Sequence, residues 1–143
     1  MKITRRFTTK DRNVFDMFEY TRRSSVLRNP DGSKVFEMTD IEVPKQWSQV
    51  ATDILAQKYF RKTGVPQRDA KGKIKLDKDG KPVTASERSI KEVVHRLVGC
   101  WKDWGEKHNY FDSPEDAQAF YDEVAYMLVH QMGAPNSPQW FNT

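Results

Sequence analysis

The stretch TASERSIKEVVHRLVGCWKDW, residues 84–104, decides the fold, because its apolar side chains recur every three or four positions. That spacing places them on one face of a helix, which must be buried against the rest of the chain. Thr84-Ala-Ser-Glu87 has the form of a capping box and predicts where the helix begins. Gly105 and Asn109 predict where it ends. The predicted buried stripe consists of Ile90, Val93, Val94, Leu97, Val98, Trp101 and Trp104.

Two further helices are expected, one on each side of this stretch. Pro44 opens a helix over residues 45–62, whose apolar positions also fall close to one face. Its predicted buried residues are Trp47, Val50, Ala51, Ile54, Leu55 and Phe60. Ser113 and Pro114 open the other helix as N-cap and first helical residue, and it continues to Gly133. The predicted buried residues there are Ala117, Phe120, Tyr121, Val124, Leu128 and Met132.

Less regular segments surround these helices. The letters SVLRNPDGSKVFEM, residues 25–38, predict a hairpin, because proline presets the second turn position and Gly32 supplies the positive φ. Residues 67–83 carry nine charges and predict a linker or a solvent-facing hairpin. The sequence contains no evident internal repeat. We therefore predict a mainly α fold, three main helices plus a small β-hairpin, with an N-terminal arm over 1–25 and a helical domain over 26–134.

The N-terminal arm alternates basic and apolar letters without a clean helical or strand period. One interpretation is an extended basic arm that binds phosphate. The other is a strap whose aromatic side chains dock on the body of the protein. Four aromatics are more than a solvated arm needs, so the strap is favoured. These aromatics are Phe7, Phe15, Phe18 and Tyr20.

Composition excludes several classes of protein. The chain has 143 residues, the length of one domain, and its 24 Lys and Arg are interleaved with 20 Asp and Glu. This balance gives little reason to expect a nucleic-acid partner. The single Cys100 excludes an internal disulfide framework and favours a reducing, cytoplasmic setting. No apolar run has the length of a membrane span, so no membrane partner is expected.

Catalytic and metal-binding residues are not evident. His95, His108 and His130 lie on or beside separate helices, with no pair at the spacing of two ligands on one helical face. Surface histidines are the better interpretation. Cys100 inside a helix is typical of a small buried hydrophobe, and DKDG at 77–80 lacks the ligand spacing and closing glutamate of a calcium loop. We predict no catalytic residue and no metal ligand.

The final letters, PNSPQWFNT, raise a separate question. Prolines 135 and 138 bias Ala134 and Ser137 away from the helical region, which predicts an extended, stiff backbone. Asn136 and the Ser137 hydroxyl would then be displayed between the two rings, available to an anionic ligand. The alternative is a plain helix terminator, with Asn and Ser acting as turn formers.

Four stretches together resemble one protein family. They are RNPDGSKVF (28–36), DIEVPKQWSQVATDILAQKYFRKTGVP (40–66), YFDSPEDAQAFYDEVAYMLVHQM (110–132) and MGAPNSPQWFNT (132–143). Each is similar to the N-terminal region of class II, adenosylcobalamin-dependent ribonucleotide reductases. The resemblance covers residues 26–143 apart from the charged loop over 67–83.

The resemblance implies a function that the residues alone do not. It implies the N-terminal part of a larger α/β-barrel reductase, in which residues 135–143 begin the barrel region and are truncated here. Ser137 and Asn136 are then expected to bind the ribonucleotide substrate, while Trp140 and Phe141 would be covered by barrel elements. The catalytic cysteines and the cobalamin surface of the family would all follow Thr143. Adenosylcobalamin would be bound by the complete enzyme, and this segment alone is expected to be inactive.

The implied partner is the remainder of the reductase, on the same chain or as a split subunit. The sequence does not say whether the substrate is a di- or triphosphate. A rival hypothesis is a free-standing helical module that binds nucleic acid or protein through the basic arm and the charged loop. Several lysines of that loop are balanced by aspartates, and no aromatic is interleaved for base stacking.

Overall fold

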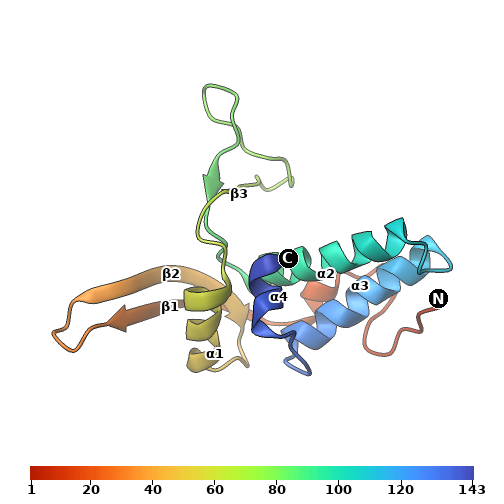
Figure 1. Ribbon diagram of the computed structural model, residues 1–143, viewed down its shortest axis with the longest axis horizontal. Helices are drawn as coiled ribbons and strands as arrows, with labels where there is room; N and C mark the ends of the chain where they lie inside the picture. Colours follow the sequence, from red (N-terminus) through yellow and green to blue (C-terminus); the bar gives the residue numbers. More distant parts are fainter.

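The computed structural model describes residues 1–143 and has a body of two long helices with two projecting hairpins (Figure 1). Helices α2 (Ile90–Lys107) and α3 (Pro114–Val129) lie side by side and form the body. One hairpin, β1 with β2, extends from one end of the body, and a second, narrower hairpin extends from the middle. The elements are η1 (Val14–Met17), β1 (Tyr20–Arg28), β2 (Lys34–Pro44), α1 (Gln49–Ile54), η2 (Leu55–Tyr59), β3 (Val65–Pro66), β4 (Thr84–Ala85), α2 (Ile90–Lys107), α3 (Pro114–Val129) and α4 (Ser137–Asn142).

The second of two capping signals in the sequence starts α2. Ser89 is the N-cap and forms a complete capping box with Glu92, so the predicted box at 84–87 is wrong. Thr84 and Ala85 belong to β4 instead, and Glu87 turns inward to pair with Arg96. The Ser/Thr-x-x-Glu pattern thus occurs at 84–87 and at 89–92. Only the second occurrence caps the helix, because the glutamate of the first pairs with Arg96.

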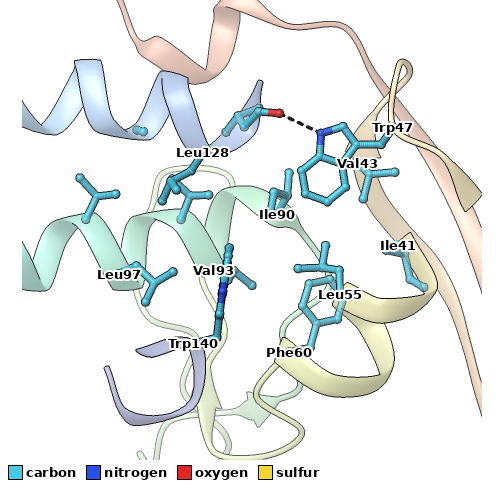
Figure 2. Packing of buried hydrophobic residues seen from close by; sticks show 14 of the residues in the cluster. Ile41, Val43, Trp47, Leu55, Phe60, Ile90, Val93, Leu97, Leu128 and Trp140 are labelled. Carbon is cyan, nitrogen blue, oxygen red and sulfur yellow. Dashed lines mark hydrogen bonds between the residues drawn. The ribbon is translucent and has the colours of Figure 1, made fainter. Parts of the chain in front are cut away.

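The buried stripe of α2 is largely as predicted, and Figure 2 shows it meeting side chains from η2, α3 and β2. Trp104 is an exception, with 50% of its surface exposed. Gly105 takes the inner position, because Phe111 lies so close that a Cβ on Gly105 would come 2.4 Å from the ring. The stripe residues that are fully buried are Ile90, Val93, Val94, Leu97 and Val98.

The helix predicted over 45–62 is shorter and changes type within its length. Pro44 ends β2, and α1 begins at Gln49 behind the N-cap Ser48. Residues Leu55–Tyr59 then widen into a π-turn, η2, which shifts the phase of the residues that follow. Leu55 and Phe60 are buried as predicted, but Ile54 and Val50 are exposed, Val50 by 66%.

Trp47 is buried as predicted, although it precedes the helix. Its indole Nε1 donates a hydrogen bond of 2.8 Å to the main-chain oxygen of Val129 at the end of α3 (Figure 2). Burial of an indole requires a partner for its N–H, and this carbonyl provides one. The contact ties the start of α1 to the end of α3.

Helix α3 begins as predicted, with Ser113 as N-cap and Pro114 in the first turn. It ends at Val129, because Gln131 takes a positive φ of 60° that closes the last turn before Gly133 is reached. Met132 therefore lies outside the helix and is 49% exposed, contrary to the prediction. The buried residues of α3 include three acidic ones that the apolar pattern did not reveal, Asp116, Asp122 and Glu123.

The first hairpin is confirmed and is longer than expected, with strands of 9 and 11 residues. Gly32 takes φ +85° at its turn, as the sequence required. Ile41 and Val43 near its base are fully buried, whereas Val26 and Val35 near its tip are exposed. With two small antiparallel sheets beside its helices, the fold is mixed rather than mainly α.

We call residues 65–85 the finger, and it confirms the solvent-facing hairpin interpretation of the charged loop. It contains two turns of one design, Asp-x-x-Gly-Lys, a short repeat that sequence analysis missed. In each, the glycine N–H donates to the aspartate main-chain oxygen, at 2.9 Å from Gly72 to Asp69 and 3.1 Å from Gly80 to Asp77. Each aspartate carboxylate also accepts two main-chain N–H groups, so every turn is closed by its own side chain.

Candidate functional site

The residues predicted to bind a ligand lie at the start of α4. Asn136 is extended, as expected, but Ser137 is the first residue of a helix, so the extended backbone predicted for it is wrong. The Asn136 side chain caps this helix by accepting the Ser137 N–H at 2.9 Å. An asparagine N-cap followed by a proline in the first turn is a helix start signal, and it outweighs the bias against helix before Pro138.

The aromatic pair of α4 is divided between core and surface. Trp140 is only 8% exposed, its ring stacks on Tyr59 at 5.1 Å, and its Nε1 donates to the Pro135 oxygen at 3.0 Å. The expectation that Trp140 needs barrel elements to cover it is therefore wrong. Phe141 also contacts the Tyr59 ring, at 5.6 Å, but remains 52% exposed.

A buried ion pair holds the other side of α4. The Arg96 guanidinium donates to both carboxylate oxygens of Glu87, at 2.8 and 3.1 Å. Its remaining N–H groups donate to the main-chain oxygens of Trp140 and Thr143, each at 2.9 Å, and of Tyr59 at 3.2 Å. Arg96 thus satisfies carbonyls at the end of α4 and joins them to η2.

Ser137 and Asn136 retain unused hydrogen-bonding capacity. The Ser137 hydroxyl has one protein partner, the Tyr59 hydroxyl at 2.9 Å. The Asn136 side chain is used through its oxygen, and its amide nitrogen donates to no protein group. Both residues are exposed. The site therefore offers a hydroxyl and an amide N–H, both neutral donors suited to phosphate or sugar oxygens.

An open apolar pocket of about 360 Å³ lies beside these donors. Tyr59 and Trp140 belong to its wall. The Tyr59 side chain therefore lines the pocket and also hydrogen-bonds to the Ser137 hydroxyl. The other residues of the wall are Trp47, Ala51, Ile54, Leu55, Leu128, Gln131, Gly133 and Ala134. Gly133, which marked the helix end in the sequence, thus also forms part of the cavity wall.

Sequence analysis missed the residues that hold this site together. Tyr59 is separated from Ser137 by 78 positions, and Arg96 from Trp140 by 44, so no local spacing could pair them. Glu87 was assigned to a cap. The available signal was Arg96 within the segment VVHRLV (93–98), because a charge next to a buried stripe requires a partner.

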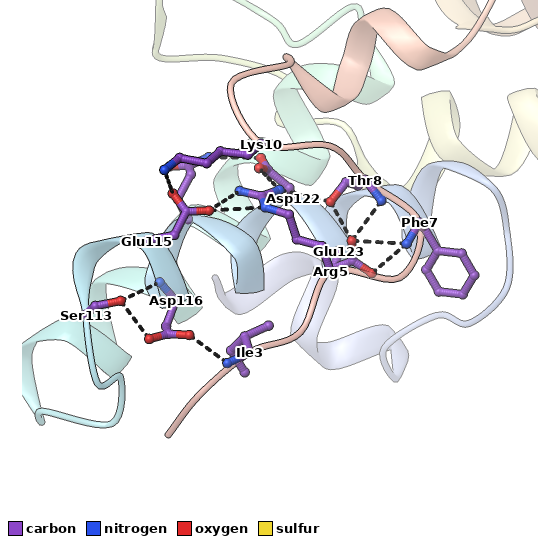
Figure 3. Close-up of polar contacts among 11 residues, drawn as sticks. Ile3, Arg5, Phe7, Thr8, Lys10, Ser113, Glu115, Asp116, Asp122 and Glu123 are labelled. Atoms are coloured by element: carbon purple, nitrogen blue, oxygen red, sulfur yellow. Dashed lines mark hydrogen bonds and ion pairs between the residues drawn. The ribbon is translucent and has the colours of Figure 1, made fainter.

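The N-terminal arm lies along α3 as the strap interpretation predicted (Figure 3). The Phe7 ring stacks on Tyr126 at 5.2 Å. Arg5 pairs with Asp122 at 2.7 Å and with Glu115 at 3.1 Å, so its charge is neutralised within the chain. This pairing leaves Arg5 unavailable to the phosphate that the alternative interpretation of the arm requires.

Two carboxylates of α3 bind the main chain of the arm. Glu123 accepts the N–H groups of Phe7 and Thr8, at 3.0 and 2.9 Å, and Asp116 accepts that of Ile3 at 2.8 Å. Burial alone would raise the pKa of Glu123, but the hydrogen bonds from the arm outweigh it and hold that pKa below its usual value. The Ser113 hydroxyl and the Ile3 N–H lower the pKa of Asp116.

The histidines and the cysteine form no common site. All three histidines are exposed, as predicted, and His95 is hydrogen-bonded to the Tyr121 hydroxyl at 2.8 Å. Cys100 is a free, half-buried thiol. No group of three or more His, Cys, Asp or Glu side chains is placed to hold a metal ion, and no helix is long and apolar enough to cross a membrane.

Comparison with known proteins identifies the family. The profile of class II vitamin B12-dependent ribonucleotide reductases matches residues 21–131. Over its whole length the chain is 48% identical to the vitamin B12-dependent ribonucleotide reductase of Bradyrhizobium diazoefficiens and 47% identical to that of Agrobacterium fabrum. It is 36% identical to the Rhodopirellula baltica enzyme of that name over 99% of the chain. The chain spans only 13%, 12% and 12% of these relatives, respectively. It belongs to the class II vitamin B12-dependent ribonucleotide reductase family, of which it represents the N-terminal region.

Proposed function

We propose that this chain is the N-terminal part of an adenosylcobalamin-dependent ribonucleotide reductase, which reduces ribonucleotides to deoxyribonucleotides for DNA synthesis. The observation that carries the proposal is the alignment of the whole chain with reductases of that name. The division follows the sequence: an arm over 1–25, a helical domain over 26–134, and residues 135–143 leading into an α/β barrel. The chain supplies no catalytic residue and contributes to substrate binding.

Ser137 and Asn136 are the proposed substrate contacts. A ribonucleotide carries phosphate oxygens, which accept hydrogen bonds, and ribose hydroxyls, which accept and donate them. The free amide of Asn136 and the Ser137 hydroxyl are donors of matching kind on an exposed surface. Because both donors are neutral, they would orient the nucleotide more than they attract its charge, which leaves charge neutralisation to other parts of the reductase.

The remainder of the reductase is the proposed partner of the apolar pocket. Three exposed apolar side chains adjoin the pocket. Ile54 belongs to its wall, and Phe141 contacts Tyr59 of the wall. Met132 lies in the sequence between two residues of the wall. A cluster of exposed apolar side chains around a pocket is typical of an interaction surface. The partner is a further part of the same chain or a separate subunit.

Adenosylcobalamin supplies radical chemistry in the proposed enzyme. The residues present here do not form its site. The apolar pocket of about 360 Å³ is small beside a corrin ring with its nucleotide arm, and its wall has few polar groups to hold the cofactor's amide side chains. The cofactor is therefore assigned to the rest of the enzyme, and we expect this chain alone to bind neither cobalamin nor nucleotide.

The test is nucleotide binding by the complete reductase that carries this chain. Ser137→Ala is expected to raise the dissociation constant of the ribonucleotide, measured by equilibrium binding, while circular dichroism stays unchanged. Ser24→Ala is the matched control, because the Ser24 side chain is exposed and forms no hydrogen bond within the chain. An unchanged dissociation constant for Ser137→Ala would remove Ser137 from the substrate site.

A further inference from the structure

We propose that Tyr59 is a positioning residue for the substrate, because it directs the hydroxyl proton of Ser137 toward a phosphate or sugar oxygen. The proposal rests on the proposed role of Ser137. Tyr59 precedes the finger in the sequence and lies 78 positions before Ser137. Their two hydroxyl oxygens are nevertheless 2.9 Å apart. This is the sole hydrogen bond that the Ser137 hydroxyl makes within the chain.

The Tyr59 ring contacts two aromatic rings of α4. Trp140 stacks on it with an interplanar angle of 25°, and Phe141 contacts it at 36°. These rings come from the same short helix that begins with Ser137, so the tyrosine and the serine are fixed relative to each other by α4. A surface tyrosine without such contacts would rotate freely and could not hold a hydroxyl in one orientation.

The backbone of Tyr59 is fixed as well. Its main-chain oxygen accepts from Arg96, which also binds the carbonyls of Trp140 and Thr143. Tyr59 is the last residue of the π-turn η2, which closes with a hydrogen bond of 3.0 Å from the Phe60 N–H to the Leu55 oxygen. Because π-turns are rare and concentrate at functional sites, this geometry supports a role beyond packing.

The direction of the hydrogen bond follows from the ligand. A phosphate oxygen in a nucleotide accepts hydrogen bonds, so Ser137 must donate its proton to that oxygen. The serine oxygen then has lone pairs left, and the Tyr59 hydroxyl can donate to one of them. Tyr59 thus holds the serine in a single orientation before the nucleotide arrives, which reduces the conformational freedom lost on binding.

The test uses the complete reductase with Tyr59→Phe, which removes the hydroxyl and keeps the ring that contacts Trp140 and Phe141. Loss of one hydrogen bond is expected to raise the ribonucleotide dissociation constant and KM about fivefold, with kcat nearly unchanged. Tyr110→Phe is the control, since Tyr110 is exposed and its hydroxyl makes no hydrogen bond within the chain. Thermal unfolding of each variant reports any loss of structure.

The double variant Tyr59→Phe with Ser137→Ala decides between positioning and packing. If Tyr59 acts through Ser137, the double variant binds nucleotide no more weakly than Ser137→Ala alone. The same fivefold loss in the Ser137→Ala background would overturn the proposal, because Tyr59 would then act independently. If Ser137→Ala binds nucleotide more weakly and Tyr59→Phe binds it normally, the role of Tyr59 is overturned. The proposed function, which rests on Ser137, stays intact. Normal binding by all three variants would remove both roles.

Discussion

The arm and α4, the first and last segments of the chain, are bound to the helical body by opposite chemistry. The arm presents main-chain N–H groups, which are accepted by the carboxylates of Asp116 and Glu123 on α3. Helix α4 presents main-chain oxygens, which accept from the guanidinium of Arg96 on α2. In both cases a charged side chain on a long helix satisfies the backbone of a short segment that could not order itself.

The two segments differ in what they leave unused. The arm uses the polar groups that face α3 in contacts with that helix, including the Arg5 guanidinium, which pairs with Asp122 and Glu115. Helix α4 leaves the second hydrogen-bonding position of Ser137 and the amide of Asn136 free. Saturated contacts indicate a structural role, whereas free donors held on an ordered segment are what a binding site requires.

Among substitutions that test this comparison, Arg96→Met is expected to lower the free energy of unfolding most. Glu87, whose side chain is 3% exposed, would lose its ion pair, and the end of α4 would lose its donors. Leaving a buried carboxylate unpaired costs about 3 kcal/mol of the free energy of unfolding. Urea denaturation checks this value.

The surface pair of Lys107 with Asp103 provides the control for that variant. Both side chains are more than half exposed, and Lys107→Met is expected to leave the free energy of unfolding nearly unchanged. Equal losses for Arg96→Met and Lys107→Met would mean that the buried pair does not hold α4.

Glu123→Gln tests the arm in the same way. The amide would replace a carboxylate that accepts from Phe7 and from both the N–H and the hydroxyl of Thr8. We expect a loss of about 1–2 kcal/mol and faster tryptic cleavage after Arg6, because the arm would detach more often. The exposed Glu106→Gln serves as control. Unchanged cleavage of Glu123→Gln would show that ring stacking alone retains the arm.

Acid should distinguish the two segments without mutation. The pKa values of Asp116 and Glu123 are lowered in the folded state, so their contribution is complete above the unfolded pKa of about 4 and is lost as pH falls through the folded values. In an NMR titration, the amide signals of Ile3 and Thr8 are expected to move before the Trp140 indole signal does. Movement of all three together would indicate a single unfolding event.

The smallest effect on stability is expected from Ser137→Ala. The residue is exposed and loses one hydrogen bond to an exposed partner, which costs less than about 0.5 kcal/mol in urea denaturation. Substrate binding by the complete reductase is nevertheless expected to weaken. A large loss of stability would mean that Ser137, like Glu123, stabilises the fold.

Periodicity predicted the helices whose burial is simple. The stripe from Ile90 to Val98 and the start of α3 at Ser113 were correct, because apolar spacing and a cap with proline act locally. The prediction failed at Val50, which is the second residue of a helix that begins at Gln49 rather than at Lys45. It failed at Trp104 because the contact of Gly105 with Phe111 decides which side of α2 faces inward.

The candidate site was only half predictable. Ser137 and Asn136 stand out in the sequence through their flanking prolines, and the resemblance to reductases supplied their expected role. Tyr59 and Arg96 could not be found in this way, because tertiary packing alone brings them to α4. Trp140 was misjudged for the same reason, since the ring that covers it comes from η2.

The finger has a practical consequence for handling the protein. Each of its turns is closed by its own aspartate and glycine, and the finger projects from the body (Figure 1). A tag or fluorophore inserted between Lys78 and Asp79 would lengthen one exposed turn, and the entropy cost of closing a longer loop grows slowly with its length. The finger is therefore a natural attachment point through which the chain can be labelled and immobilised while Ser137 and the pocket stay accessible.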